Sequence, residues 1–454
     1  MSAKNSFSLF FASSFLILIF AQLCSQSALA QNSSYSANTN AIGGTESAGF
    51  GFQALLSNTN YGNTASGFKA LRANTSGFGN TAIGSSALLV NTTGFSNTGI
   101  GYIALYSNTT GDANTGVGYA SLIYNTSGIN NSANGAFSLY TNTTGKNNTA
   151  MGTRSLYLNT IGEENTANGS GSLFNNLSGF SNTASGYQSM YSNTTGSDNT
   201  AMGRFAIRGN TTGSDNIGIG SGALYSNTTG SKNTAIGSFA LSNATTTRNT
   251  ALGYFALLNT SGAANTAVGT EALRSNGSGK DNVAVGDSAG YASIGSGNIF
   301  LGKRAGANET GSNKFYLGNS PENTLMYGNI STGQLLIGNS NPLGYTFKGN
   351  RKLNVMGGIL VDSLRITPLA DWADYVFADN YNLKPLTELE NFIKINKHLP
   401  NIPTSKDVST NGIELGEMNI KLLEKVEELT LYILQQQKEI ELIKVRLRKV
   451  ELPR

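Results

Sequence analysis

Few residues in this chain have a type and spacing that could do chemistry. The chain holds one histidine, His398, and one cysteine, Cys24. A metal centre or a Cys–His nucleophile needs several such side chains close together. His398 stands alone beside Pro400 in a loop-like stretch, so we expect a structural role for it.

The carboxylates and glycines between Gln31 and Tyr345 also lack a catalytic pattern. Glu163, Glu164, Asp198 and Asp215 are isolated at turn-like positions, whereas cleavage of a polysaccharide needs clustered carboxylates. No glycine run continues into a GK[ST] phosphate loop, and no aspartate recurs as in calcium-binding repeats. We therefore expect no catalytic, cofactor-binding or metal-binding residues, no cofactor and no enzymatic activity.

Charge is distributed unevenly along the 454 residues. Residues 31–345 contain 24 charged side chains, whereas the shorter stretch 346–454 contains 31. This contrast indicates a domain boundary between a nearly uncharged region and an ordinary charged one. The net charge of +4 is small for this length, so composition gives no reason to expect a nucleic-acid partner.

The first 30 residues are typical of a signal peptide. Lys4 supplies the positive start, Phe7–Ala21 is an apolar run, and Ala28-Leu29-Ala30 is a small-residue cleavage site. The alternative is a membrane anchor, but the run is short for a membrane span. Cleavage after Ala30 would leave a mature chain with no cysteine and no transmembrane segment, which we expect to be exported.

A 17-residue phrase, NTAIGSSALLVNTTGFS at Asn80–Ser96, recurs through most of the chain. Two residues after its first asparagine stands Ala or Gly, and four after it stands Gly. Eight after it stands a large aliphatic residue in every unit from Asn63 to Asn265, and a second glycine ends the NTTG element. A fixed period of this length predicts a solenoid. The units begin at Asn63, Asn80, Asn97, Asn114, Asn131, Asn148, Asn165, Asn182, Asn199, Asn216, Asn233, Asn249, Asn265 and Asn282.

The spacing of the two glycines predicts which solenoid this is. Glycine turns that separate short Thr- and aliphatic-rich runs indicate two short strands per unit. We therefore expect residues 31–318 to form a parallel β-solenoid or β-roll of 16–17-residue coils. The aliphatic column is expected to be buried jointly by three chains, while Asn and Thr form hydrogen-bonded ladders and a repetitive polar surface. The unbroken aliphatic column argues against a disordered segment.

The last segment, residues 411–454, has the heptad pattern of a coiled coil. β-branched residues at both core positions favour three strands, so we expect a homotrimer in which Asn419 and Gln436 fix the register. An amphipathic helix packed on its own domain is the alternative; a basic-zipper DNA binder is excluded because the preceding segment has few basic residues. The a positions are Val426, Ile433, Ile440 and Leu447, and the d positions are Leu415, Leu422, Leu429, Ile443 and Val450.

A small β-rich neck is expected at residues 319–410, between the solenoid and the coiled coil. Tyr345–Ile366 has the pattern of two or three short strands with glycine breaks. Thr387 and Glu390 have the spacing of a capping box that opens a short helix ending before Pro400.

The phrase N-[TS]-[AG]-[IVM]-G resembles the head repeats of trimeric autotransporter (YadA-like) adhesins. The similarity is sharpest in NVAVGDSAGYASIGSGNIFLGKRAG, residues 282–306. The resemblance implies a left-handed parallel β-roll, three chains side by side, and binding of host or matrix molecules. The family's usual repeat is shorter, and the segment after the rod here has no pattern of its membrane-embedded anchor.

The C-terminal part resembles the tail-fibre-like ends of secreted bacterial proteins. The similar segments are residues 374–404 and 411–441, which begin DYVFADNYNLKPL and NGIELGEMNIKLL. Together these features predict an exported, non-catalytic trimeric fibre at the surface of, or secreted by, a Gram-negative-type bacterium. Its expected partners are an extracellular matrix, host-cell or polysaccharide ligand. The alternative is a solenoid that binds an ordered lattice, such as ice or crystalline polysaccharide.

Overall fold

The computed structural model describes residues 35–36, 46–338, 342, 345–347, 349–365 and 372–451. The chain divides into two compact units, Met1–Gly358 and Ile359–Arg454. The predicted signal peptide, residues 1–30, lies outside the described residues.

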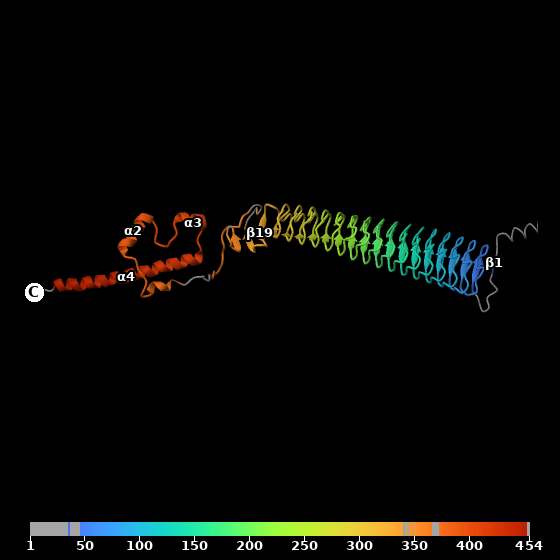
Figure 1. Cartoon of the computed structure of the whole chain (residues 1–454), viewed down its shortest axis with the longest axis horizontal. Coiled ribbons are helices and arrows are strands. Elements are labelled where there is room, and N and C mark those ends of the chain that lie inside the picture. Colours follow the sequence, from blue (N-terminus) through green and yellow to red (C-terminus); the bar gives the residue numbers. More distant parts are fainter. Residues whose placement is uncertain are drawn as a thin grey trace, which may run out of the picture. The chain divides into compact units, whose positions relative to one another are not determined.

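The first unit is a β-solenoid whose strands stack in one parallel ladder (Figure 1). Strands β2 to β18 each pair with the next strand along the chain, and β1 (Tyr35–Ser36) pairs antiparallel with β2. The bounds are β2 Ala48–Phe50, β3 Thr64–Ser66, β4 Thr81–Ile83, β5 Thr98–Ile100, β6 Thr115–Val117, β7 Ser132–Asn134, β8 Thr149–Met151, β9 Thr166–Asn168, β10 Thr183–Ser185, β11 Thr200–Met202, β12 Ile217–Ile219, β13 Thr234–Ile236, β14 Thr250–Leu252, β15 Thr266–Val268, β16 Val283–Val285, β17 Ile299–Leu301 and β18 Lys314–Gly318.

The strand register confirms the parallel solenoid and its 16–17-residue coil. Thr81 pairs with Thr98, and Ala82 pairs with Gly99, so one sequence unit is one coil. Each coil nevertheless contains one three-residue strand, so the prediction of two strands per coil is wrong. The reason is left-handed backbone at positions such as Leu88 (φ 51°), which no extended strand allows. That segment still bonds to the next coil, because the Leu88 amide donates to the Ala104 carbonyl at 3.0 Å.

Each coil closes around its own leucine. Leu88 and its equivalents from Leu71 to Leu273 are 0% exposed in a single chain, as are the strand alanines such as Ala82. The prediction that three chains bury the aliphatic column together is therefore wrong. Seventeen residues are enough to encircle one leucine, and the coils above and below cover it.

The asparagines form two ladders inside the solenoid, not on its surface. The first asparagine of each unit, such as Asn97, and the asparagine of the NTT element, such as Asn108, are both fully buried. Asn97 Nδ2 donates to Asn80 Oδ1 at 3.2 Å, and Asn108 Nδ2 donates to Asn91 Oδ1 at 2.8 Å. The expected Asn ladders exist, but they satisfy buried polar groups and add nothing to the outer surface.

The two glycine columns serve different needs. Gly84 has φ 127°, a conformation that strongly favours glycine, and turns the chain after the strand. Gly94 lacks room for a side chain, because a Cβ there would lie 2.4 Å from the Gly111 carbonyl oxygen. The first glycine therefore supplies a turn, and the second allows coils to stack closely.

The solenoid sheet continues beyond residue 318. Strands β19 (Thr324–Asn329) and β20 (Gln334–Ile337) extend it as an antiparallel hairpin, and β21 (Leu353–Val355) pairs parallel with β20. Among the described residues of 345–366, β21 is the one strand, so the expectation of two or three strands there is wrong.

The second unit is helical. It contains a 3₁₀ turn, η1 (Ala373–Phe377), and the helices α2 (Leu386–Asn396), α3 (Ser405–Asn411) and α4 (Leu415–Glu451). None of the helices in the described residues is long and apolar enough to cross a membrane.

The short helix expected before Pro400 exists as α2, but its predicted capping box is wrong. The N-cap is Pro385, which makes no side-chain cap. The capping box instead opens α3, where Thr404 and Asp407 bond reciprocally. In this capping box the third helical residue is Asp407. The usual sequence pattern has Glu or Gln at that residue, so it does not identify this box.

Candidate functional surfaces

The outward side chains of the solenoid fall on three faces, defined here by their position after the first asparagine of each unit. The strand face carries positions 1 and 3, such as Thr81 and Ile83. The aromatic stripe carries positions 5, 6 and 9, and the turn edge carries positions 15 and 16. Each face repeats coil after coil, because the register is constant.

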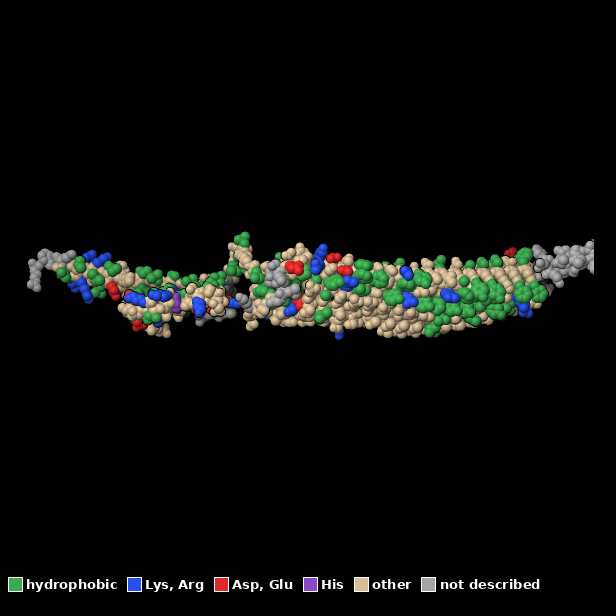
Figure 2. All heavy atoms as spheres, turned by 90° about the horizontal axis from the view of Figure 1, so that it is seen from above, with side chains coloured by type: hydrophobic (Ala, Val, Ile, Leu, Met, Phe, Trp, Pro, Cys, Tyr) green, Lys and Arg blue, Asp and Glu red, His purple; other side chains and the backbone are tan. Residues whose placement is uncertain are grey.

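The aromatic stripe is a face on which rings from successive coils stack. Stacked rings follow one another along it: Tyr140–Tyr157, Tyr157–Phe174 and Phe174–Tyr191, each with centroids 4.9 Å apart. Figure 2 shows hydrophobic side chains gathered over the N-terminal part of the solenoid, with Lys and Arg among them. The rings of the stripe are Phe52, Phe68, Tyr102, Tyr106, Tyr119, Phe137, Tyr140, Tyr157, Phe174, Tyr187, Tyr191, Phe205, Tyr225, Phe239, Tyr254, Phe255 and Tyr291.

Arginine continues the ring stack where an aromatic residue is missing. The Arg208 guanidinium lies 5.4 Å from the ring centre of Tyr191 and 5.7 Å from that of Tyr225, distances typical of cation–π contacts. Arg208 Nη1 also donates to the Tyr225 hydroxyl at 3.3 Å. Neighbouring coils therefore cover the ring faces in the stacked part of the stripe and leave the ring edges outward.

The turn edge begins apolar and becomes charged along the chain. Tyr61 stacks on Phe78 at 5.6 Å, and Phe78 stacks on Phe95 at 5.0 Å. The carboxylates Glu163, Glu164, Asp198 and Asp215 lie farther along the same edge, as their turn-like sequence context predicts. Its members are Tyr61, Phe78, Phe95, Asp112, Ile129, Lys146, Glu163, Glu164, Phe180, Asp198, Asp215, Lys232, Arg248, Lys280 and Asp281.

None of these side chains forms a metal site in the described part of the chain. No group of three or more His, Cys, Asp or Glu residues converges there. His398 lies in the helical unit, where its Nδ1 is 2.8 Å from the Leu399 carbonyl oxygen and its ring contacts the Phe392 ring edge-on. These contacts hold the His398 ring in the loop that follows α2.

Helix α4 buries its polar side against its own unit and leaves its apolar side exposed. Glu424, Glu427 and Tyr432 are buried. In contrast, the apolar a and d side chains are exposed, from 46% at Ile440 to 84% at Val450. The predicted heptad seam is therefore unpaired within the chain. Helix α4 does pack on its own unit, as in the alternative interpretation, but through its polar side.

A cluster of hydrogen bonds holds the polar side of α4. The Tyr375 hydroxyl donates to Glu424 at 2.6 Å, and Lys425 Nζ donates to Glu424 at 2.7 Å and to Glu428 at 2.9 Å. The Tyr381 hydroxyl donates to Glu428. This cluster ties η1 and the loop after it to α4, and it was not predicted because each tyrosine is 47 or more residues away from the glutamate that it bonds.

The charges in this cluster are poorly suited to acid–base chemistry. Burial raises the pKa of Glu424, but hydrogen bonds from Lys425 and Tyr375 outweigh it and lower the pKa overall. Burial likewise lowers the pKa of Lys425, but its bonds to Glu424 and Glu428 raise it overall. Both groups therefore stay ionised at neutral pH, and a general acid or base needs a pKa near the working pH.

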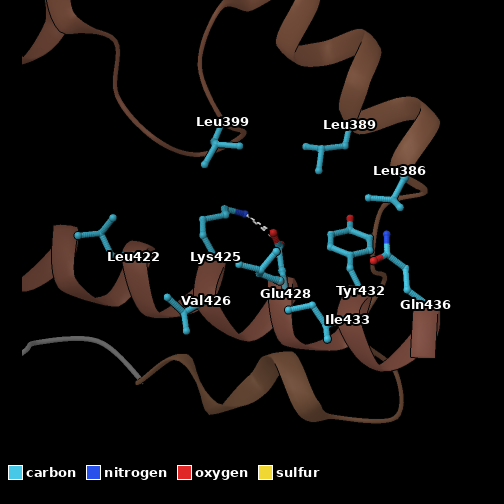
Figure 3. Close-up of a pocket in the computed structure, with 11 residues that line it drawn as sticks. Leu386, Leu389, Leu399, Leu422, Lys425, Val426, Glu428, Tyr432, Ile433 and Gln436 are labelled. Carbon is cyan, nitrogen blue, oxygen red and sulfur yellow. Dashed lines mark hydrogen bonds and ion pairs between the residues drawn. The ribbon is translucent and has the colours of Figure 1, made fainter. Parts of the chain in front are cut away.

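An apolar groove runs beside the seam (Figure 3). Its volume is about 600 Å³. Leu386 and Leu389 of α2, with Leu399 of the following loop, face α4 across the groove. The α4 wall includes the core positions Leu422, Val426, Leu429, Ile433 and Gln436. The groove therefore adds apolar side chains from α2 and the following loop to the exposed apolar surface of the N-terminal half of the seam.

Comparison of the chain with models of known protein families, with curated proteins and with solved structures finds no match. The resemblances described above therefore rest on the quoted motifs alone.

Proposed function

We propose that this protein is an exported, non-catalytic fibre that acts as an adhesin or a structural appendage at the surface of, or secreted by, a Gram-negative-type bacterium. In this proposal, α4 joins copies of the chain into a parallel homotrimer. The solenoid acts as a spacer with a repetitive surface. This surface binds an extracellular matrix, host-cell or polysaccharide ligand.

The main support for the proposal is that α4 buries its polar side and leaves its apolar side exposed. Its acidic and tyrosine side is packed, whereas Val426, Ile433 and Ile440 of the seam are about half exposed. From Ile433 to Val450 every side chain is exposed, whereas most helices in proteins are stabilised by packing of their apolar face. A second and third copy of α4 would bury this seam.

The sequence of the seam supports three parallel strands. Ile at both core positions of the C-terminal part of the seam, Ile440 at a and Ile443 at d, favours trimers over dimers. Glu439 occupies a g position and Lys444 the following e position. In a parallel in-register bundle these two lie next to each other on neighbouring helices, and their opposite charges attract.

The solenoid supports a structural role because each chain completes its own core. Leucine, alanine and asparagine columns are all buried in one chain, so a long, regular surface is available without partner chains. A surface that repeats at every stacked coil suits a spacer that presents repeated contacts.

Sedimentation equilibrium of the mature chain tests the proposal. We expect the wild-type mass to be that of three chains and Ile433→Asp/Ile440→Asp to have the mass of one. Leu434→Asp/Leu442→Asp is the matched control, because these leucines are equally exposed but lie off the seam; it should remain a trimer. A monomeric wild-type chain would contradict the proposal.

Lattice binding remains the second candidate, and the strand face is what favours it. Threonines recur there in register, as in Thr81, Thr98 and Thr115. The buried asparagines cannot take part, and Ile217 and Val283 interrupt the threonine column. Clear thermal hysteresis or ice shaping by the protein would favour this candidate over the adhesin.

A further inference from the structure

We propose that helix α2 of one copy packs against helix α4 of the next copy, so that three α2 helices form an outer layer around the three α4 helices. This inference rests on the proposed parallel association through α4. It assigns one occupant to the apolar groove between α2 and α4: the flank of α4 in the neighbouring chain.

Helix α2 lacks a complete packing partner in the single chain. None of its 11 residues is buried. Leu386 is 48% exposed, and Leu399 in the loop after the helix is 41% exposed. A helix this short is marginal in water by itself, so its stability depends on packing of an apolar face. We therefore expect a second surface to cover the apolar side of α2.

The groove lies on the side of α4 that a neighbouring helix approaches. Its α4 wall includes Leu429 at a d position of the seam and Lys425 and Tyr432 at the g positions beside it. Figure 3 shows Leu386 and Leu389 of α2 facing this wall. In a parallel coiled coil the g flank of one helix lies beside the e flank of its neighbour. The e flank of the neighbouring α4 therefore lies at the open side of the groove.

The residues on that e flank change character where the groove ends. At the level of the groove the e positions of α4 are Leu423, Thr430 and Gln437, and all three are uncharged. The next e position is Lys444, whose opposite-charge partner on the neighbouring helix is Glu439. Flanking positions that face water commonly carry such charges, whereas a position covered by an apolar helix does not. The uncharged stretch therefore matches the length of α4 that α2 can cover.

The polar groups at the g positions of the groove are already bonded within the chain. Lys425 Nζ donates to Glu424 at 2.7 Å and to Glu428 at 2.9 Å. The Tyr432 hydroxyl donates to the Lys384 carbonyl oxygen. A neighbouring helix that covers the groove therefore leaves neither group without a partner, and the usual cost of burying an unpaired polar group does not arise.

Cysteine cross-linking of the full mature chain tests the contact, since the sequence after Ala30 has no cysteine. Leu386 and Gln436 line the same groove, and Gln437 of the neighbouring α4 lies at that level in an in-register bundle. Leu386→Cys/Gln437→Cys treated with a short bismaleimide should yield a denaturation-resistant product with the mass of three chains. The register control, Leu386→Cys/Leu423→Cys, moves the second thiol two heptads along the same flank, about 21 Å, and should remain single chains.

The outcomes separate this inference from the proposed function. A single-cysteine variant can join at most two chains, so a three-chain product requires the contact between α2 and the neighbouring α4. A protein that sediments as a trimer but gives only single-chain products from Leu386→Cys/Gln437→Cys overturns the inference and leaves the α4 association standing. A three-chain product from the register control also overturns it. A monomeric wild-type protein in sedimentation overturns both proposals.

A charge placed on the groove wall gives an independent test. Leu386→Lys should raise the concentration at which the trimer dissociates by about tenfold or more, because the ammonium group would be buried against the neighbouring chain. Ile395→Lys is the matched control, since Ile395 is on the same helix, is 79% exposed and lies outside the groove lining. Both residues are exposed in the single chain, so neither substitution should unfold it. Equal dissociation concentrations for the two variants would overturn the inference.

Discussion

Replacing one buried amide with a carboxylate tests how the coils are held together. Asn148 is fully buried. Its Nδ2 donates to the Gly162 carbonyl at 2.8 Å and to Asn131 Oδ1 at 3.1 Å. Its Oδ1 accepts from the amide nitrogen and from Nδ2 of Asn165 at 3.0 and 3.1 Å. Asn148→Asp keeps the shape and both acceptor contacts but removes both donated bonds.

The size of the effect follows from the two acceptors left without a donor. A buried polar group that loses its partner costs about 1–3 kcal/mol, so two cost roughly 2–6 kcal/mol. Burial and the facing oxygens also raise the pKa of the introduced carboxyl above its unfolded value of about 3.9. The variant is therefore least destabilised below that value and loses stability as the pH rises through the folded pKa.

Hydrogen exchange of the amides around this coil measures the loss locally, because a repeat array need not unfold in one step. Asn147→Asp is the matched control: the neighbouring Asn147 is exposed, and its Oδ1 accepts from Asn130 as a carboxylate also would. We expect protection to fall strongly in Asn148→Asp and hardly in Asn147→Asp. Equal protection in the two variants at neutral pH would refute the role of the ladder.

Three further predictions concern the core, the close-packed glycines and the helical unit. Leu156→Ala should destabilise the solenoid by about 2–5 kcal/mol, because Leu156 is 0% exposed, whereas the partly exposed Leu158→Ala should have a much smaller effect in thermal unfolding. Gly145→Ala should disrupt the stacking of the coils, because the new Cβ would lie 2.4 Å from Asn142 Oδ1. Gly358→Ala is the control, because a Cβ there meets nothing within 4 Å. Thermal melting followed by circular dichroism should show a lower melting temperature for the first variant only. The hydrogen bond to Glu424, with burial, raises the pKa of Tyr375 to about 12, so its stabilisation should be complete below pH ~10 and be lost as pH rises through 12. Tyr375→Phe should flatten that alkaline loss of helicity, and an unchanged profile would contradict the assignment.

The repeat predicted the architecture because it constrains every coil in the same way. The 17-residue period fixed the coil, and the conserved position of leucine identified the core column. The number of strands could not be predicted from the glycines, since Leu88 and Ser86 adopt left-handed backbone that their residue types disfavour. Hydrogen bonds between coils hold that conformation, and they depend on the stacked structure rather than on local preference.

The placement of the polar columns also required the structure. Asparagine is usually exposed, so Asn80 and Asn91 were expected on the surface. Both are buried because each amide finds partners one coil away. In the helical unit, the heptads identified the exposed seam, but the Tyr375–Glu424 contact joins residues 49 apart in sequence, and no short-range pattern predicts it.

The most direct test of this account is the state of the solenoid when the chain is alone. If one chain completes its own core, Ile433→Asp/Ile440→Asp should sediment as a single chain and still show slow exchange of the amides at Leu88, Leu156 and Leu224. Loss of that protection in the monomer would mean that the leucine column needs three chains, which contradicts the self-contained coil.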